Sequence, residues 1–296
     1  MYAPSFEYFR ARSVADAHQL LSAHPGAKLL AGGHSLLPLL KLRLAAPSAL
    51  VDIGRIPELR GISRQGDQVR IGALTTHAEL AASADLRSAA PALADAAAMV
   101  GDPAIRNRGT IGGNIAHADP ASDLPTVLVA LDARIVAAGP GGERSIPADQ
   151  FFTGIMTTAL SEDEILVAIH VPASASGQSS AYEKFSHPAS RYAVLGAAAW
   201  VAVRNGTCSS ARIALGGLLP NARRAGRAER ALIGKALNED TIAAAANEVR
   251  ADLGNDVIGD IYASAEYRAA MAPVFTKRAL ASAAARLRAS RFGEAG

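Results

Sequence analysis

The sequence is poor in the residues that build disulfides, metal sites and iron–sulfur clusters. Its 296 residues include one cysteine, Cys208, and aromatic residues make up only 5% of the chain. A disulfide framework needs cysteine pairs, and zinc sites and iron–sulfur clusters need several ligands, so we expect none of them here. The seven histidines are scattered and form no HExxH pair. Any redox chemistry must therefore use an organic cofactor or a metal held by another chain, and Cys208 is predicted to be a small packed residue.

Long apolar runs and a strong charge imbalance are also missing. The longest apolar run, residues 193–203, is shorter than the ~20 residues of a membrane-spanning helix. Residues 1–14 carry three charged side chains and no apolar segment, so we expect no secretory signal and a cytoplasmic protein. A net charge of +3 with few aromatics does not indicate nucleic-acid binding. Basic residues are locally in excess between residues 204 and 230: Arg204, Arg212, Arg223, Arg224, Arg227 and Arg230. We interpret them as a solvated surface, or alternatively as a docking face for an acidic partner or a nucleotide phosphate.

The sequence has enough apolar residues to form a core, and its patterns are typical of mixed helices and strands. Half of the residues are apolar, and the length suggests about two domains. The expected helices in the first part are 14–24, 36–44, 76–82 and 91–100, and a further helix begins at Leu124 with Asp123 as its N-cap. The expected strands are 27–31, 50–53, 68–72, 133–138 and 165–171, and the segment between Arg106 and Asp123 is predicted to be irregular.

The second part of the chain follows a small, polar segment, residues 173–180, where we place a domain boundary. A strand is expected at 181–185. Strands 197–204 and 208–216 are predicted to pair across Asn205 and Gly206, because this dipeptide suits a type I′ hairpin turn. The remaining expected elements are helices 225–233, 240–253 and 266–288.

The first of two glycine motifs joins a predicted strand to a predicted helix. It runs Ala31, Gly32, Gly33, His34, Ser35, Leu36. The paired glycines would let a ligand approach the backbone, where consecutive N–H groups can converge on an anion, and the serine adds a hydroxyl donor. These are the requirements of a phosphate or diphosphate cradle, although the spacing is not that of the dinucleotide GxGxxG motif.

The second glycine motif lies in the segment expected to be irregular. It runs Gly109, Thr110, Ile111, Gly112, Gly113, Asn114. Its glycines are predicted to expose further backbone donors beside a hydroxyl and an amide side chain. Each glycine pair taken alone favours a simple tight turn, whereas the two motifs together favour the binding of one extended diphosphate.

The motifs AGGHSLLP and TIGGNIAHADPASD, the segment 263–268 and the order of elements resemble the FAD-binding medium subunit of molybdenum hydroxylases, such as those of carbon monoxide and xanthine dehydrogenase type. The resemblance covers essentially the whole chain. It implies an α+β fold with a two-lobed FAD-binding domain of the PCMH/VAO type over residues 1–175, with lobes of about 1–58 and 59–175. A smaller C-terminal α+β domain, residues 176–296, would follow with a hairpin sheet and helices.

The resemblance also assigns roles to residues. FAD would be held by Ala31, Gly32, Gly33, His34, Ser35 and Leu36 of the first motif and by Thr110, Ile111, Gly112, Gly113 and Asn114 of the second. Asp123 would lie near the ribityl or adenosine part. Tyr192 would cover one flavin face, with a packed interface aromatic as the alternative. Lys184 would place a positive charge near the ring, with a solvated strand lysine as the alternative. No residue of this chain is expected to be catalytic, because its chemistry would be electron transfer at the flavin.

The same resemblance implies partners. A large subunit would hold the molybdenum cofactor, a small subunit would hold two [2Fe–2S] clusters, and the complex would be a dimer of heterotrimers. Two other functions remain open: a self-sufficient flavin oxidoreductase, and a cofactor-free assembly or interaction protein on the same fold. Bulky substitutions at Gly33 or Gly113 are predicted to abolish FAD retention while leaving the fold largely intact.

Overall fold

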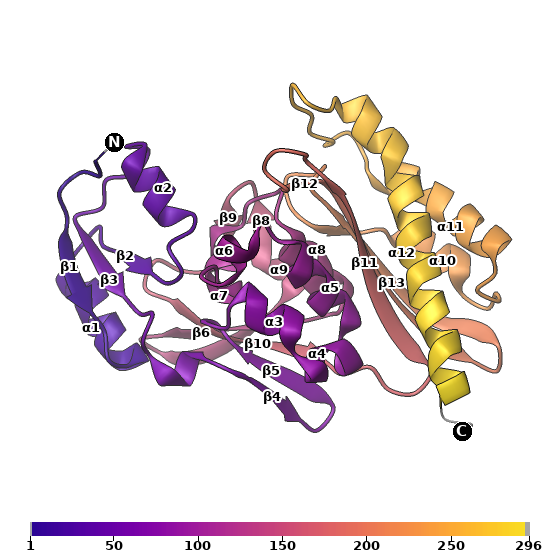
Figure 1. The fold of residues 1–296 in the computed structure, drawn as a ribbon, viewed down its shortest axis with the longest axis horizontal. Helices are drawn as coiled ribbons and strands as arrows, with labels where there is room; N and C mark the ends of the chain where they lie inside the picture. Colours follow the sequence, from indigo (N-terminus) through magenta and orange to yellow (C-terminus); the bar gives the residue numbers. More distant parts are fainter. Residues whose placement is uncertain (1, 294–296) are drawn as a thin grey trace.

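The computed structural model describes residues 2–293 and the side chains of residues 2–289. The described chain forms three regions in a row along the long axis of the molecule (Figure 1). Each region is built around its own sheet, whose strands come from one continuous part of the chain. The predicted mixed α+β fold is confirmed.

The first region holds a three-stranded parallel sheet in the order β1-β3-β2. Its central strand is buried along most of its length, which explains its apolar sequence ALVD. Ser13 caps the first helix by accepting a hydrogen bond from the Asp16 N–H at 3.1 Å, as its position in the sequence indicated. The elements are β1 (Glu7–Arg10), α1 (Val14–Ala23), β2 (Lys28–Leu30), α2 (Leu36–Lys41) and β3 (Ala49–Asp52).

The second region is a five-stranded antiparallel sheet covered on one face by short helices. The sheet order is β4-β5-β10-β6-β7, and the strands are β4 (Ile62–Gln65), β5 (Gln68–Gly72), β6 (Arg134–Gly139), β7 (Gly142–Pro147) and β10 (Ile165–Pro172). A 3₁₀ turn, η1 (Pro57–Leu59), precedes the sheet. A small two-stranded ribbon of β8 (Phe152–Gly154) and β9 (Thr157–Thr158) lies between β7 and β10 in the chain. The helices are α3 (His77–Ala82), α4 (Ala84–Ala89), α5 (Pro91–Met99), α6 (Pro103–Arg106), α7 (Ile111–His117), α8 (Asp123–Ala130) and α9 (Ala148–Phe151).

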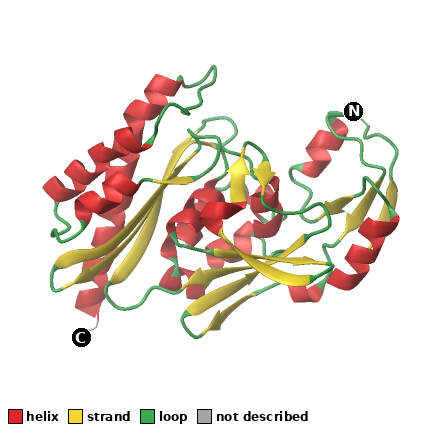
Figure 2. Cartoon of the chain, turned by 180° about the vertical axis from the view of Figure 1, so that it is seen from behind, coloured by secondary structure: helices red, strands yellow, loops and turns green. Residues whose placement is uncertain are grey.

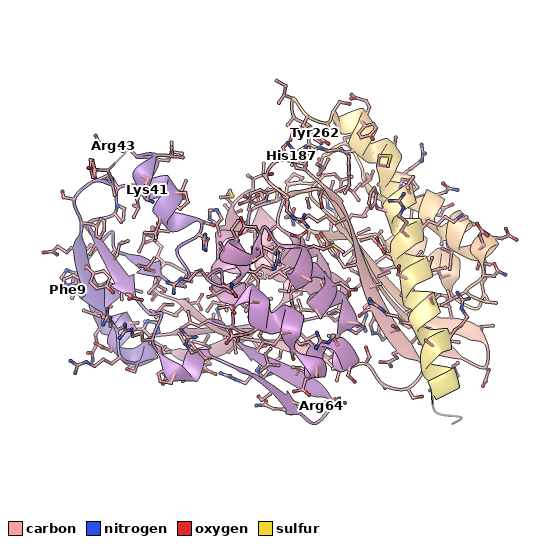
Figure 3. The ribbon with its side chains drawn as sticks, in the orientation of Figure 1. Phe9, Lys41, Arg43, Arg64, His187 and Tyr262 are labelled. Carbon is pink, nitrogen blue, oxygen red and sulfur yellow. The ribbon has the colours of Figure 1, made fainter. Side chains whose placement is uncertain are left out.

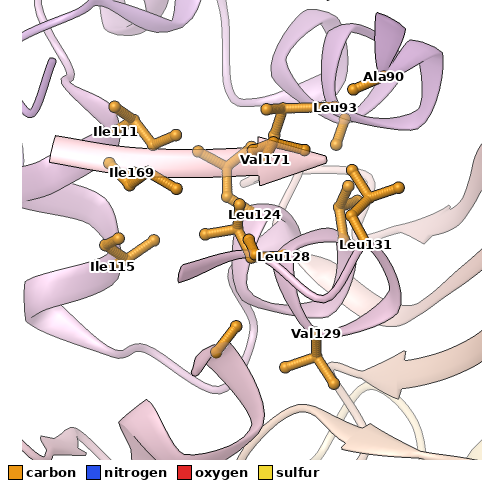
Figure 4. Close-up of a cluster of buried hydrophobic side chains, with 14 of the residues drawn as sticks. Ala90, Leu93, Ile111, Ile115, Leu124, Leu128, Val129, Leu131, Ile169 and Val171 are labelled. Carbon is orange, nitrogen blue, oxygen red and sulfur yellow. The ribbon is translucent and has the colours of Figure 1, made fainter. Parts of the chain in front are cut away.

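The core of this region lies between the sheet and its helices. Ile169 and Val171 of β10 face Leu93 of α5 and the apolar side of α8 (Figure 4). On the opposite face of the same strand, Ile165 and Val167 pack against the first region. A register shift in the β10–β6 pairing between Leu166 and Ala168 accompanies this change of face. One strand therefore joins the cores of two regions.

The segment that was predicted to be irregular between Arg106 and Asp123 instead contains α7. Two adjacent glycines weaken a helical pattern in sequence, but tertiary contacts outweigh that cost here. Thr110 caps the helix by accepting a hydrogen bond from Gly113 N–H at 3.2 Å, and Ile111 and Ile115 are buried. Ala118 ends the helix with a left-handed backbone, φ 53°.

The predicted N-cap role of Asp123 is also wrong. Ser122, with an extended backbone, occupies the cap position, and Asp123 is the first residue of α8. The Asp123 carboxylate instead binds Tyr182 and Lys184, as described below.

The third region is a four-stranded antiparallel sheet in the order β11-β12-β13-β14 with three helices. The predicted hairpin is confirmed, because Asn205 and Gly206 both have positive φ, 52° and 80°, between paired strands. The elements are β11 (Gln178–Ser186), β12 (Ala193–Arg204), β13 (Thr207–Gly216), β14 (Arg223–Arg224), α10 (Gly226–Leu232), α11 (Glu239–Asp252) and α12 (Ala265–Gly293).

This third sheet is covered on both faces (Figure 2). Leu195 and Ile213 point into the core with α10–α12, whereas Tyr182 and Trp200 point into the core of the second region. Burial on two sides explains why β12 is a nearly continuous apolar run without polar alternation. Cys208 is buried among apolar residues, as predicted.

Part of the arginine excess is structural rather than a simple solvated surface. Arg212 and Arg224 both pair with Asp132 of the second region, and Arg212 also lies 3.7 Å from the Trp200 ring centroid. Arg224 additionally pairs with Glu229. These arginines therefore hold the second and third regions together.

Candidate functional site

The candidate site is a cavity of about 560 Å³ to which all three regions contribute. The first region supplies β2, α2 and the first glycine motif. The second supplies Ala73 and Leu74 just after β5, the start of β10, and α7, and the third supplies residues 190–192. Every predicted site residue except Ile111 and Lys184 lines this cavity: Ala31, Gly32, Gly33, His34, Ser35, Leu36, Thr110, Gly112, Gly113, Asn114, Asp123 and Tyr192. The fold thus brings together motifs that are separated by about 80 residues in the sequence.

The first motif presents a run of backbone donors. The N–H groups of residues 32–35 make no hydrogen bond to any part of the chain that the structure describes. Gly33 has φ +80°, a left-handed backbone that bends the chain between β2 and α2. Consecutive unpaired N–H groups at a bend are the geometry that binds anions, so this loop suits a phosphate or diphosphate.

Gly32 serves a purpose that the sequence did not indicate. A Cβ atom at Gly32 would overlap the carbonyl oxygen of Arg108 and would lie 3.0 Å from Cα of Gly109. The two motifs therefore touch through their backbones at this point. Glycine is required here for contact between the motifs, and Gly32 also lines the cavity, where the predicted close approach of a ligand to its backbone would occur.

The second motif uses its backbone donors internally, so the prediction that it exposes them is wrong. The N–H groups of Ile111 and Gly112 donate to the carbonyls of Thr75 and Ala73 at 2.9 and 2.8 Å. Those of Gly113 and Asn114 donate to the hydroxyl and the carbonyl of Thr110 at 3.2 and 3.0 Å.

What this motif offers instead is open space and one side-chain amide. Gly113 is exposed, and a Cβ there would lie 2.9 Å from the Thr110 hydroxyl that caps the helix and 3.8 Å from the Ala31 side chain. The side-chain carbonyl of Asn114 accepts from the Ser122 hydroxyl at 2.7 Å. Its NH₂ group makes no hydrogen bond within the described chain and is free to donate to a ligand.

Asp123 lies at the centre of a buried hydrogen-bonded triad that joins the second and third regions. Its carboxylate accepts from the Tyr182 hydroxyl at 2.7 Å and from the Lys184 ammonium at 2.8 Å. The Lys184 ammonium also donates to the carbonyl of Met99 at 3.2 Å, and its side chain is only 1% exposed. The alternative of a solvated strand lysine is therefore wrong, and its charge is paired with a carboxylate that itself lines the cavity.

The electrostatics of this triad follow from its burial. Burial raises the pKa of Asp123, and the Lys184 ammonium and the Tyr182 hydroxyl oppose that shift. Burial also raises the pKa of Tyr182 well above its usual value, so the phenol stays protonated at neutral pH and donates to Asp123. Gly196 is needed opposite Tyr182, because a Cβ there would overlap the phenol oxygen.

Tyr192 projects from a loop that the third region holds in place. It lines the cavity and is 49% exposed, so it is not a packed core aromatic within the described chain. His187 organises the loop: its Nδ1 accepts from the N–H of Ser190 at 3.2 Å, and its ring lies 4.5 Å from that of Tyr262 (Figure 3). Burial, followed by Asp119 and Asp123, raises the pKa of Tyr192.

The third region also supports the chain that leads to Asp123. The N–H groups of Ala193 and Gly217 donate to the carbonyls of Ala121 and Pro120, both at 3.0 Å. Arg268, from the segment 263–268 noted in the sequence, is 4% exposed and donates to the carbonyl of Gly217 at 2.8 Å. The ends of β12 and β13 are thereby fixed against the site.

Sequence reasoning missed several residues that line the cavity, including His77, Leu160 and Glu162. The capping box of Thr76 and Glu79 was recognised and is present, and it places His77 at the first position of α3. This signal could have pointed to His77, whereas nothing local marks the other two.

Two family models match the chain. Residues 4–174 match the FAD binding domain in molybdopterin dehydrogenase, and residues 180–283 match the CO dehydrogenase flavoprotein C-terminal domain. Within residues 2–293 no helix is long and apolar enough to span a membrane.

Individual proteins resemble it over nearly their full length. The chain is 45% identical over 289 residues to the carbon monoxide dehydrogenase medium chain of Hydrogenophaga pseudoflava, covering 97% of this chain and 99% of that one. It is 35% identical over 281 residues to the xanthine dehydrogenase FAD-binding subunit of Escherichia coli O157:H7, covering 94% and 96%.

Solved structures show the same architecture. A carbon monoxide dehydrogenase structure from Hydrogenophaga pseudoflava superposes with a TM-score of 0.92 at 47% identity, covering 97% of this chain and 99% of that chain. Quinoline 2-oxidoreductase from Pseudomonas putida 86 superposes with a TM-score of 0.91 at 35% identity, covering 97% and 99%.

Proposed function

The chain belongs to the family of FAD-binding subunits of molybdenum hydroxylases, and on this premise we propose that it passes electrons from iron–sulfur clusters of a partner subunit through FAD to an external acceptor. The observation that carries the proposal is the run of unpaired N–H groups at residues 32–35, a site for a diphosphate at the wall of a cavity of about 560 Å³. With one cysteine, the chain lacks the thiolates for a cluster of its own.

The cavity fits FAD in its donors and its walls. The N–H groups of residues 32–35 would hold the diphosphate, and Gly113 and Asn114 would let the cofactor pass close to α7. Asp123, held by Lys184, would bind a polar part of the cofactor, and Tyr192 would cover one face of the ring. Bound FAD supplies the redox chemistry, taking up electrons singly and releasing them in pairs, while this chain binds and orients it.

The proposal includes the partners implied by this function. A large subunit with the molybdenum cofactor and a small subunit with two [2Fe–2S] clusters would assemble with this chain as a dimer of heterotrimers in the cytoplasm. Residues 1–175 would form the FAD-binding domain and residues 176–296 the C-terminal domain. Relatives are named as subunits of a carbon monoxide dehydrogenase, a nicotine 6-hydroxylase and a caffeine dehydrogenase, which supports the same role in enzymes with different substrates.

Substitution at Gly113 tests the FAD site. Gly113→Leu should fill the space beside Ala31 and abolish FAD retention, with the circular dichroism spectrum unchanged. Gly141→Leu is the matched control, because a Cβ at Gly141 meets nothing within 4 Å and the residue does not line the cavity. Gly33 is the poorer choice, since its φ of +80° would strain any side chain. Normal flavin absorbance in purified Gly113→Leu protein would contradict the proposed site.

Reconstitution tests the electron-transfer role against the two other functions. Substrate-dependent reduction of an acceptor should require this chain together with its large and small subunits. Turnover by the FAD-loaded chain alone would support a self-sufficient oxidoreductase. A colourless chain that takes up no FAD would support an assembly protein.

A further inference from the structure

His77 is a buried imidazole at the point where the two glycine motifs meet. It is 3% exposed, lines the cavity, and begins α3 with its backbone N–H donating to the carbonyl of Gly109 at 3.0 Å. The Nε2 edge of its ring faces the second motif, because a Cβ at Gly109 would lie only 2.9 Å from Nε2 and 2.8 Å from Cδ2. The ring therefore lies beside the backbone contact between Gly32 and Gly109.

The imidazole has no hydrogen-bond partner in the part of the chain that the structure describes. Nδ1 is fully buried and unpaired, and Nε2 makes no hydrogen bond to the protein. Buried polar side chains in native proteins are almost always paired, so an unpaired imidazole at a ligand cavity points to a partner from outside the chain. Because Nδ1 is closed off from the cavity, that partner would bind Nε2, on the ring edge that faces the second motif. The other buried unpaired atoms are hydroxyls, a guanidinium nitrogen and one ring nitrogen, His18 Nε2, on residues that do not line this cavity.

The surroundings of His77 favour an uncharged ring. Burial, with smaller effects from His34 and Arg106, lowers the pKa of His77 to about 4. At physiological pH the ring is a neutral group with one donor and one acceptor, so it can hydrogen bond to a ligand without adding charge.

We propose that His77 is a binding residue of the FAD site and that its imidazole hydrogen bonds to the bound cofactor where the two glycine motifs touch. This inference rests on the proposed function. It adds to the first and second motifs a third ligand-binding element, the first turn of α3, which is held beside them by the hydrogen bond to Gly109 and the bridge between Thr76 and Thr110.

The test compares the stability of the FAD-free chain with its affinity for FAD. Leucine is similar in size to histidine but has no ring nitrogens. In His77→Leu we expect the FAD dissociation constant to rise about tenfold, which corresponds to the loss of one hydrogen bond. We expect the midpoint of urea unfolding of the FAD-free variant to be unchanged or higher, because an unpaired buried polar group has been removed. A purely structural histidine would give the opposite result, with lower stability and unchanged affinity, and that result would overturn the proposal.

Two further variants make the result specific. His77→Gln keeps a donor and an acceptor and should retain more affinity than His77→Leu; equal loss in both would overturn the proposed hydrogen bond. His170→Leu is the matched control, because His170 bonds to Gln68 away from the cavity, and its FAD affinity should equal that of the wild type. If the wild-type chain takes up no FAD, the proposed function itself fails, which distinguishes that outcome from a specific failure at His77.

Discussion

Replacing Lys184 by methionine should lower the free energy of unfolding by about 3–4 kcal/mol at neutral pH. The ammonium and the Asp123 carboxylate are 1% and 5% exposed, and removing one member of a buried ion pair costs about 3–5 kcal/mol. Protonation limits the loss, because proton uptake at pH 7 by a carboxyl with an ordinary pKa of about 3.9 costs about 4 kcal/mol. Methionine has a similar length, so little of the loss comes from a cavity. Tyr182 remains as a donor to Asp123 but cannot neutralise its charge.

The assay is urea unfolding of the FAD-free chain, followed by circular dichroism at several pH values. Without its ammonium partner, Asp123 should have a folded-state pKa that is raised further above the unfolded value. A group with a raised folded pKa stabilises the fold below the unfolded pKa, and that stability is lost as the pH rises through the folded pKa. The difference between wild type and variant should therefore be smaller near pH 5 than near pH 8.

Two results would refute this reasoning: a loss below about 1 kcal/mol at neutral pH, or a loss that does not change with pH. The double variant Asp123→Asn with Lys184→Met removes both charges and should cost less than the sum of the single changes. Additive effects would mean that the two side chains do not interact as the structure shows.

Three further changes have outcomes that the structure determines. The Arg144 guanidinium lowers the pKa of Glu164 from 4.5 to about 2. The ionised carboxyl therefore stabilises the fold above about pH 4.5, and this contribution is lost as the pH falls through 2. In Glu164→Gln, the free energy of unfolding measured with urea should depend less on pH in the acid range. Gly32→Ala should push the two motifs apart, lowering the unfolding free energy by about 1–3 kcal/mol and weakening FAD binding in a titration, whereas Gly141→Ala should leave both unchanged. Arg286→Ala should cost about 1 kcal/mol in urea unfolding, because its bidentate pair with Asp95 is only partly buried; a loss near zero would show that this contact between α5 and α12 does not contribute to stability.

Local signals predicted most of the elements. The Ser13 cap, the capping box at Thr76 and the Asn205–Gly206 turn each involve residues within a few positions of one another, and the structure has all three. The first glycine motif was likewise recognisable, since a bend with free N–H groups depends on the backbone of a few consecutive residues.

The predictions that failed depend on residues distant in sequence. The helix α7 forms despite its glycines because Gly112 packs directly on Ala73, about 40 residues earlier. Asp123 does not cap α8, and its carboxylate instead accepts from Tyr182 and Lys184, which lie 59 and 61 residues later. A sequence pattern reports the preference of a segment by itself, and at these positions a distant partner outweighs that preference.

The triad around Asp123 has a consequence for engineering. Its acid comes from α8, whereas its hydroxyl and its ammonium come from β11, so the two sides of one buried charge pair lie on opposite sides of residue 175. A chimera that joins residues 1–175 of this chain to the C-terminal part of another protein would have to bring a matching tyrosine and lysine. Without them, the retained half, residues 1–175, would contain a buried carboxylate with no counterion, and the hybrid would be destabilised even before any cofactor was added.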